Sequence, residues 1–372
     1  MGQDFPAPAL PSPSIPLQTT SDTDGPRRRS KDNPPSLLKR LRYGLEGAGL
    51  EAAALFIPLL PRALVNALGW CVGTAAYFAL KEDRQVGFAN LDIALGETKS
   101  PKEKKRIVMS AFRNLASNLL GLFWGPRLTE KNVGRYVKTD PDNLAWLERV
   151  RGRGKGVILV TPHYGDWELG SLAAGLLGIP YTTVAEPTRN PAIEKIISRL
   201  RSRSGHTTVP PRFAVVKLYK ALARGGTVTL LIDVNARRGR GGVWLDFFGL
   251  PVFNTGAVAE LAMRTGAAIV FVAAHPLPGR RITLTFGPEI EPSATGDHED
   301  DVLTTSQRCL DACAALIREH PEHWLWTYKR WKRRPAEEMG RFPFYSKYDE
   351  NTESRQKDPA LVITPRPLAK AA

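Results

Sequence analysis

The stretch GVILVTPHYGDWELGSLAAGLLG, residues 156–178, decides the fold of this chain. Residues 156–161 form a short apolar run of the kind that makes a buried strand, and residues 168–178 have a helical pattern. Further apolar runs at 227–234 and 268–276 alternate with helical segments. Strands that are apolar on both faces indicate a sheet covered by helices on each side. The sequence therefore predicts an α/β fold whose central, mostly parallel sheet is flanked by helices.

A histidine and a carboxylate flank the turn that follows the first of these strands. His163 and Glu168 are five positions apart, an offset that puts them on different faces of a continuous helix or strand. Gly165 lies between them and supplies a turn that lets the two side chains converge. We expect His163 at the carboxyl end of the strand and Glu168 in the first helical turn. Asp166 competes for the carboxylate role, or caps the helix without taking part in chemistry.

This pair suits general base catalysis at the carboxyl edge of a sheet, where α/β proteins form their sites. An imidazole has an ordinary pKa of about 6.5, and a carboxylate on its second nitrogen fixes the tautomer that accepts a proton. The chain has no GxSxG motif and no cysteine near His163, so a covalent acyl-enzyme is not indicated. From the spacing alone, a purely structural pair remains the alternative.

The net charge of the chain favours certain classes of binding partner but does not choose among them. The 372 residues include 52 Lys and Arg against 37 Asp and Glu, which gives a net charge of +15. This excess favours nucleic acid, an anionic lipid surface or an acidic carrier protein. Three cysteines without a CxxC pair argue against a disulfide framework or a cysteine-rich zinc site, and we expect no metal and no cofactor. His320 and His323 alone make a poor metal site.

Composition divides the chain into four parts. Residues 1–35 are rich in proline and serine and are predicted to be a disordered tail, as are residues 346–372. Residues 36–100 are predicted to be a helical segment that associates with a membrane, and residues 101–345 the α/β domain. The domain begins with a predicted amphipathic helix at 101–125.

The membrane prediction rests on two apolar runs that a proline and an arginine separate. The runs are AAALFIPLLP at 52–61 and ALVNALGWCVGTAAYFAL at 63–80. The second run has 18 residues, just short of the ~20 that usually span a bilayer. It is interpreted as a membrane helix or an in-plane anchor, and the alternative is a buried hairpin of the soluble fold.

Several blocks of the chain, in a fixed order, resemble one known family. The chain is similar to the late lipid A acyltransferases, the Kdo-dependent lauroyl and myristoyl transferases, which are related to the glycerolipid acyltransferases. The resemblance covers roughly residues 45–335. It is carried by ANLDIAL (89–95), HYGDWE (163–168), PTRNPAIEKII (187–197), GGTVTLLID (225–233), GVWLDFFGLP (242–251) and HPEHWLWTYKRWKRRP (320–335).

The resemblance implies an acyltransferase fold in which His163 and Glu168 are the catalytic dyad. It also implies substrate-binding roles, in which an arginine stabilises the oxyanion or binds a lipid phosphate and the turn after residue 233 contacts substrate. For Arg189 the alternative is a salt bridge that only fixes a loop. The implied substrate-binding residues are Asp166, Arg189, Asn190, Asp233, Arg237 and Arg238.

The same resemblance implies a reaction and a location. The acyl donor is an acyl-carrier protein thioester, the acceptor is a hydroxyl of a lipid A-type glycolipid, and the site faces the cytoplasm at a bacterial inner membrane. An acyl-CoA-dependent enzyme that acylates another glycolipid, such as a phosphatidylinositol mannoside, is the alternative within this class. A basic nucleic-acid-binding protein is the alternative from another class.

The segment WLWTYKRWKRR, residues 324–334, interleaves aromatic and basic residues. Such a composition is typical of a membrane interface with anionic headgroups, and it also suits single-stranded nucleic acid. The resemblance favours the membrane.

Overall fold

The central sheet of the protein is the α/β sheet that the sequence predicts. The computed structural model describes residues 37–188, 190–212, 214–236, 241–278, 281–335 and 340–349. Within these ranges seven strands form one sheet in the order β1-β9-β8-β2-β5-β3-β4, and neighbouring strands are parallel except β8 and β9. The strands are β1 (Val137–Lys138), β2 (Val157–Thr161), β3 (Thr182–Val184), β4 (Thr207–Val209), β5 (Thr227–Leu231), β8 (Ala268–Leu277) and β9 (Arg281–Ile290).

Alternating side chains of β2 enter the two apolar layers of the core. Ile158 and Val160 belong to the layer beneath α8, α9 and α10, whereas Val157 and Leu159 belong to the layer beneath α5 and α6. This alternation follows from the two-residue period of a strand and explains why the whole run is apolar. The covering helices are α5 (Pro141–Arg151), α6 (Trp167–Leu176), α8 (Ala214–Leu222), α9 (Ala257–Thr265) and α10 (His298–Glu319).

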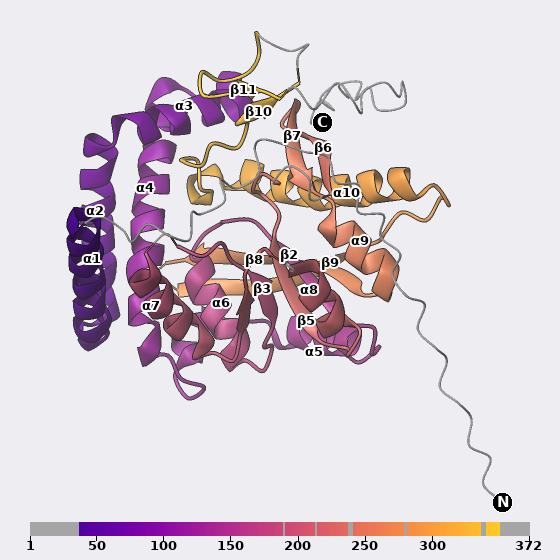
Figure 1. Cartoon of the computed structure of the whole chain (residues 1–372), viewed down its shortest axis with the longest axis horizontal. Coiled ribbons are helices and arrows are strands. Elements are labelled where there is room, and N and C mark those ends of the chain that lie inside the picture. Colours follow the sequence, from indigo (N-terminus) through magenta and orange to yellow (C-terminus); the bar gives the residue numbers. More distant parts are fainter. Residues whose placement is uncertain are drawn as a thin grey trace, which may run out of the picture.

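A separate antiparallel hairpin follows β5 rather than extending the sheet. It consists of β6 (Gly242–Phe247) and β7 (Leu250–Thr255) and packs against α10. Figure 1 shows the hairpin rising above the sheet beside α10.

Four helices precede the sheet and form a layer at one end of the molecule (Figure 1). They are α1 (Leu37–Phe56), α2 (Arg62–Ala79), α3 (Lys81–Leu95) and α4 (Pro101–Trp124), and α4 confirms the predicted amphipathic helix. A capping box between Ser100 and Glu103 fixes the start of α4. Helix α2 lies along α4, and α1 packs against α7 (Pro191–Ser202).

The apolar runs at 52–61 and 63–80 do not form a buried hairpin. No single helix in the described ranges is both long and apolar enough to cross a bilayer; Arg62–Ala79 and Lys81–Thr98 pass only as a pair, bent by 92°. Large apolar side chains of α1, α2 and the turn between them remain exposed. They are Leu41, Leu45, Leu55, Phe56, Leu59, Leu64, Leu68, Trp70, Val72, Phe78 and, just after α2, Leu80, and we call this set the apolar face.

The prediction that residues 324–334 lie at a membrane interface is wrong for their three tryptophans. Trp324, Trp326 and Trp331 are at most 1% exposed, and Arg330 is 0% exposed. These side chains fill the core beneath α10 and the hairpin, where aromatic rings contribute large buried areas. Composition alone did not distinguish a buried aromatic cluster from an interfacial one.

The chain remains ordered past the boundary that the sequence suggests at residue 346. Strand β11 (Lys347–Tyr348) pairs in parallel with β10 (Arg333–Arg334), and Tyr345 is buried against the core. The predicted tails at 1–35 and beyond residue 349 lie outside the described residues.

The contact between α2 and α4 provides a test of the packing. A Cβ at Gly73 would lie 2.4 Å from the Cα of Arg113, so Gly73→Ala must push the helices apart. We expect the free energy of unfolding to fall by about 1–3 kcal/mol, measured by chemical denaturation. The matched control is Gly49→Ala in α1, where a Cβ meets no atom within 4 Å. Equal effects of the two substitutions would contradict this packing.

Candidate active site

The turn between β2 and α6 places His163 at the carboxyl edge of the sheet. Pro162 has no N–H and ends the hydrogen bonding of the strand. Gly165 follows with φ of +61°, and a Cβ there would lie 2.1 Å from the carbonyl oxygen of Ala274. Only glycine fits this position, because it tolerates both the positive φ and the close approach. The Asp166 side chain then accepts from the Leu169 N–H at 3.1 Å and caps α6.

The carboxylate that contacts His163 is Asp233, two residues after β5. The His163 Nδ1 lies 2.9 Å from Asp233 Oδ1, and the His163 backbone N–H donates to Oδ2 at 2.8 Å. Trp324 Nε1 also donates to Oδ2, at 2.9 Å. Because an ionised carboxylate only accepts, the proton of a neutral His163 is on Nδ1 and its Nε2 carries a lone pair. His163 is thus set up as a proton acceptor.

Glu168 lies in the first turn of α6, as the sequence predicts, but its side chain does not point to His163. Its carboxylate is buried and forms an ion pair with Arg201 of α7, with 2.5 Å between Oε1 and Nη2. Among the hydrogen bonds of the described residues, none joins Glu168 to His163. The expected contact between these two side chains is therefore wrong, although the Glu168 charge still acts on His163 through space.

The surroundings of His163 make its protonated form more stable than it is in water. Burial lowers the pKa of His163, but the charge and hydrogen bond of Asp233, together with the charge of Glu168, raise it above the ordinary value. For Asp233, burial raises the pKa, but the His163 charge and the hydrogen bonds from His163 and Trp324 lower it below the ordinary value. Asp233 therefore stays ionised while His163 gains and loses a proton.

A comparison with known proteins identifies the family. The profile of the bacterial lipid A biosynthesis acyltransferases matches residues 36–333, which is most of the chain. The chain belongs to this family. The matched range includes the His163 turn, the Asp233 strand end and the buried tryptophans, so the resemblance that the sequence suggests is confirmed.

Individual relatives agree with this assignment. The lipid A biosynthesis palmitoleoyltransferase of Escherichia coli K12 is 27% identical over 305 residues, which is 80% of this chain and 94% of that protein. The lipid A biosynthesis lauroyltransferase of the same organism is 26% identical over 79% of this chain and 93% of that protein. A phosphatidylinositol mannoside acyltransferase of Mycolicibacterium smegmatis is 28% identical over 55% of this chain and 66% of that protein. The chain is an O-acyltransferase.

Asp166 and Asn190, both implied to bind substrate, hold the fold around the site of this acyltransferase. Besides capping α6, Asp166 accepts from Arg62 Nη2 of α2 at 2.6 Å. Burial raises the pKa of Asp166, and the Arg62 charge opposes that rise. The Asn190 side chain caps α7 and donates to the carbonyl of Tyr43, which fastens α7 to α1.

Arg189, Arg237 and Arg238 lie outside the described residues, so their implied roles stay predictions.

The sequence does not predict the contacts of two residues of the site, Arg201 and Trp324. An arginine on an amphipathic helix usually faces solvent, and the sequence predicts that Glu168, the partner of Arg201, contacts His163. The composition around Trp324 favours a membrane interface. One signal could have singled out Trp324, its place in the sixth block of the resemblance. A buried indole N–H usually needs a hydrogen-bond acceptor, and Asp233 supplies it here.

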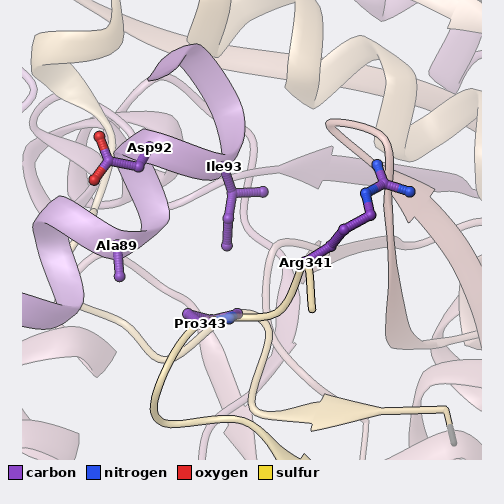
Figure 2. A pocket seen from close by; sticks show the side chains of 5 residues that line it. All are labelled: Ala89, Asp92, Ile93, Arg341 and Pro343. Carbon is purple, nitrogen blue, oxygen red and sulfur yellow. The ribbon is translucent and has the colours of Figure 1, made fainter. Parts of the chain in front are cut away.

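Two hollows bear on where substrates enter. One of about 230 Å³ lies after the ends of β3 and β4, next to the catalytic edge, and Arg201 forms part of its wall. The other, of about 350 Å³, lies between α3 and the segment 341–343 and is open to solvent. Figure 2 shows Ile93 and Arg341 on opposite sides of this second hollow. Neither lining includes His163 or Asp233, but that of the first hollow includes Arg201, the partner of Glu168.

The contact between Asp233 and His163 predicts the effect of Asp233→Asn on rate. Losing the carboxylate removes the group that fixes the tautomer, so kcat should fall roughly a thousandfold or more. The matched control is Asp246→Asn in the hairpin, which should keep kcat within a few-fold. A fully active Asp233→Asn beside an inactive Glu168→Gln would return the carboxylate role to Glu168.

The raised pKa of His163 predicts the pH dependence. A general base works only when neutral, so kcat/KM should fall as the pH drops through the raised pKa, at a pH above the ordinary value of about 6.5. In Asp233→Asn the residual activity should have its acid limb at lower pH, because the stabilising charge is gone. An acid limb that does not move between the two proteins would contradict this assignment.

Proposed function

We propose that this protein transfers a fatty acyl group from an acyl-carrier protein thioester to a hydroxyl of a lipid A-type glycolipid precursor, with His163 as the general base. The observation that carries the proposal is the contact between His163 Nδ1 and Asp233, which leaves Nε2 to accept a proton. His163 is about one-quarter exposed, so a substrate can reach it.

The reaction follows from this geometry in two proton transfers. His163 Nε2 takes the proton of the acceptor hydroxyl while that oxygen attacks the thioester carbonyl. The tetrahedral intermediate then breaks its C–S bond, and the imidazolium returns the proton to the leaving thiolate. Asp233 remains ionised throughout and stabilises the imidazolium. The products are an ester and a free thiol, with no covalent enzyme intermediate.

Arg201 suits stabilisation of the negative oxygen in the tetrahedral intermediate. Its charge acts on His163, so the guanidinium lies near the reacting centre, and its side chain is about one-third exposed. The bond to Glu168 occupies part of the fork and fixes its orientation. In this proposal Glu168 contributes to catalysis by holding Arg201 rather than by holding His163.

The donor is proposed from charge. A chain of net charge +15 attracts an acidic carrier protein and accelerates its encounter. Acyl-CoA is the second candidate, together with an acceptor of the phosphatidylinositol mannoside kind, because the mycobacterial relative with that name matches over more than half of the chain. The nucleic-acid alternative keeps only the support of the net charge, since the tryptophans that would stack on bases are buried.

We place the enzyme on the cytoplasmic side of a bacterial inner membrane through the apolar face of α1 and α2. Isolated exposed apolar residues are ordinary, but eleven of them occur on two successive helices and the residues next to them. Helices that lie in the interface with one apolar side buried in lipid have this pattern. Helix α1 packs on α7, which carries Arg201, so the membrane and the site share a supporting element.

The proposed function is tested in cells and in vitro. A strain that lacks the gene, complemented with His163→Ala at normal expression, should lack the acylated glycolipid that wild type restores, as measured by mass spectrometry of extracted lipids. The purified enzyme should then be given the same acyl chain on carrier protein and on CoA. Restoration of the lipid by His163→Ala would refute the role of the histidine, and preference for CoA would refute the donor.

The apolar face predicts a loss of membrane binding on charge insertion. Trp70 and Phe78 are 46% and 64% exposed, and each is expected to gain about 1.5–3 kcal/mol on burial in lipid. Trp70→Glu with Phe78→Glu should therefore weaken binding to anionic vesicles at least about tenfold in co-sedimentation.

The matched control for this test is Val216→Glu with Tyr219→Glu on α8, where the two side chains are 52% and 41% exposed. This pair should leave vesicle binding near the wild-type value. Equal losses in the two double variants would contradict the assignment of α1 and α2 to the membrane.

A further inference from the structure

Arg330 is a fully buried cation that contacts Asn235, on the same turn as Asp233. Its side chain is 0% exposed and its guanidinium lies over the ring of Phe247, 5.2 Å from the ring centre. Its Nη1 donates to Asn235 Oδ1 at 3.1 Å, while Nε and Nη2 have no hydrogen-bond partner among the described residues. A buried guanidinium with a single neutral acceptor is strongly destabilised unless an anion compensates it.

The turn that Arg330 contacts through Asn235 also carries a buried carboxylate, that of Asp233. Asp233 is 2% exposed and precedes Asn235 by two residues, on the same turn after β5. Burial lowers the pKa of Arg330 to about 10, and the charge of Asp233 is the largest influence that opposes this drop. No hydrogen bond among the described residues joins the two side chains, so Arg330 acts on Asp233 through its charge.

Asn235 fixes the position of this charge. Its side-chain amide donates to the carbonyl of Lys329 at 2.9 Å, and its backbone N–H donates to the Tyr328 hydroxyl at 3.1 Å. Together with the bond from Arg330, these contacts fasten residues 328–330 to the turn that carries Asp233. Three hydrogen bonds, and not one flexible side chain alone, therefore fix Arg330 relative to this turn.

We propose that Arg330 is a positioning residue for the acyl transfer: its charge keeps Asp233 ionised and aligned while preventing that carboxylate from trapping His163 in the protonated, inactive form. This inference rests on the proposed role of His163 as the base. Each carboxylate near His163 then has its own guanidinium, Glu168 with Arg201 and Asp233 with Arg330.

Several other charged and titratable groups act on His163, Asp233 and Arg330. His163 is influenced by Asp233 after β5, Glu168 of α6 and Arg201 of α7. Asp233 faces His163, Trp324 and Arg330, and its charge also raises the pKa of the buried Cys313 of α10. Tyr328, Cys313 and Tyr345 also act on Arg330 through their charges. Of these groups, Arg330 is the cation that acts on Asp233 without touching His163.

The test is the pH profile of kcat/KM for the full-length enzyme in detergent micelles. Arg330→Gln should move the acid limb to higher pH by about half a unit to one unit, because His163 now meets an uncompensated carboxylate. Arg330→Lys should keep the limb near the wild-type position. The matched control is Lys329→Gln, which removes a neighbouring but outward charge that pairs with Glu82 and should leave the limb unmoved.

A purely structural Arg330 gives a different result. In that case Arg330→Gln lowers the melting temperature but its acid limb coincides with that of wild type, and the proposal is overturned. Activity that survives in His163→Ala would instead remove the proposed base itself, and these two failures are distinguishable because they concern different variants.

If Arg330→Gln does not fold by itself, a comparison of melting temperatures tests the proposal instead. Asp233→Asn leaves the Arg330 charge buried without its anion, so the double variant Asp233→Asn with Arg330→Gln should melt higher than Asp233→Asn, by about 3 °C or more. A double variant that melts no higher than Asp233→Asn would show that the two charges do not interact and would refute the proposal.

Discussion

The hydrogen bonds between His163 and Asp233 are the interaction on which the rest of the site depends. They exist because β2 and β5 are adjacent parallel strands with Thr161 paired to Leu231, so the residue two positions beyond each strand arrives at the same place. The positive φ of Gly165 turns the chain away immediately afterwards, and its N–H is held by the carbonyl of His323. Trp324, the next residue, donates to the same carboxylate. Three segments far apart in sequence thus meet at one imidazole.

The surrounding charges separate into two layers with different tasks. Arg201, the partner of Glu168, lines the hollow after β3 and β4, whereas Asp233 and Arg330 are buried. Pairing each carboxylate with a guanidinium keeps buried charges compensated, which is the condition for retaining them in an apolar interior. It also keeps the imidazole responsive to the substrate proton. Glu168 and Arg201 belong to α6 and α7, which pack against α4 and α1, so in the proposed function membrane docking and catalysis use the same helices.

The sequence was sufficient for the fold class, the position of His163 and the turn after β2, because these follow from local patterns. It was not sufficient for the partner of His163. Glu168 is nearer in sequence, but Arg201 of α7 draws it away, and the contact with Asp233 depends on which strands are neighbours. That order places β5, not the next strand in the chain, beside β2. The prediction for the aromatic and basic segment 324–334 failed for a related reason. Its composition suits a buried network as well as a membrane interface.

The most direct test of the account is the tautomer of His163, observed by nitrogen NMR of the histidine-labelled enzyme above the pH at which His163 titrates. The account predicts a neutral ring protonated on Nδ1, with a proton signal shifted by a strong hydrogen bond that disappears in Asp233→Asn and persists in Glu168→Gln. A ring protonated on Nε2, or a signal that depends on Glu168 and not on Asp233, would contradict it.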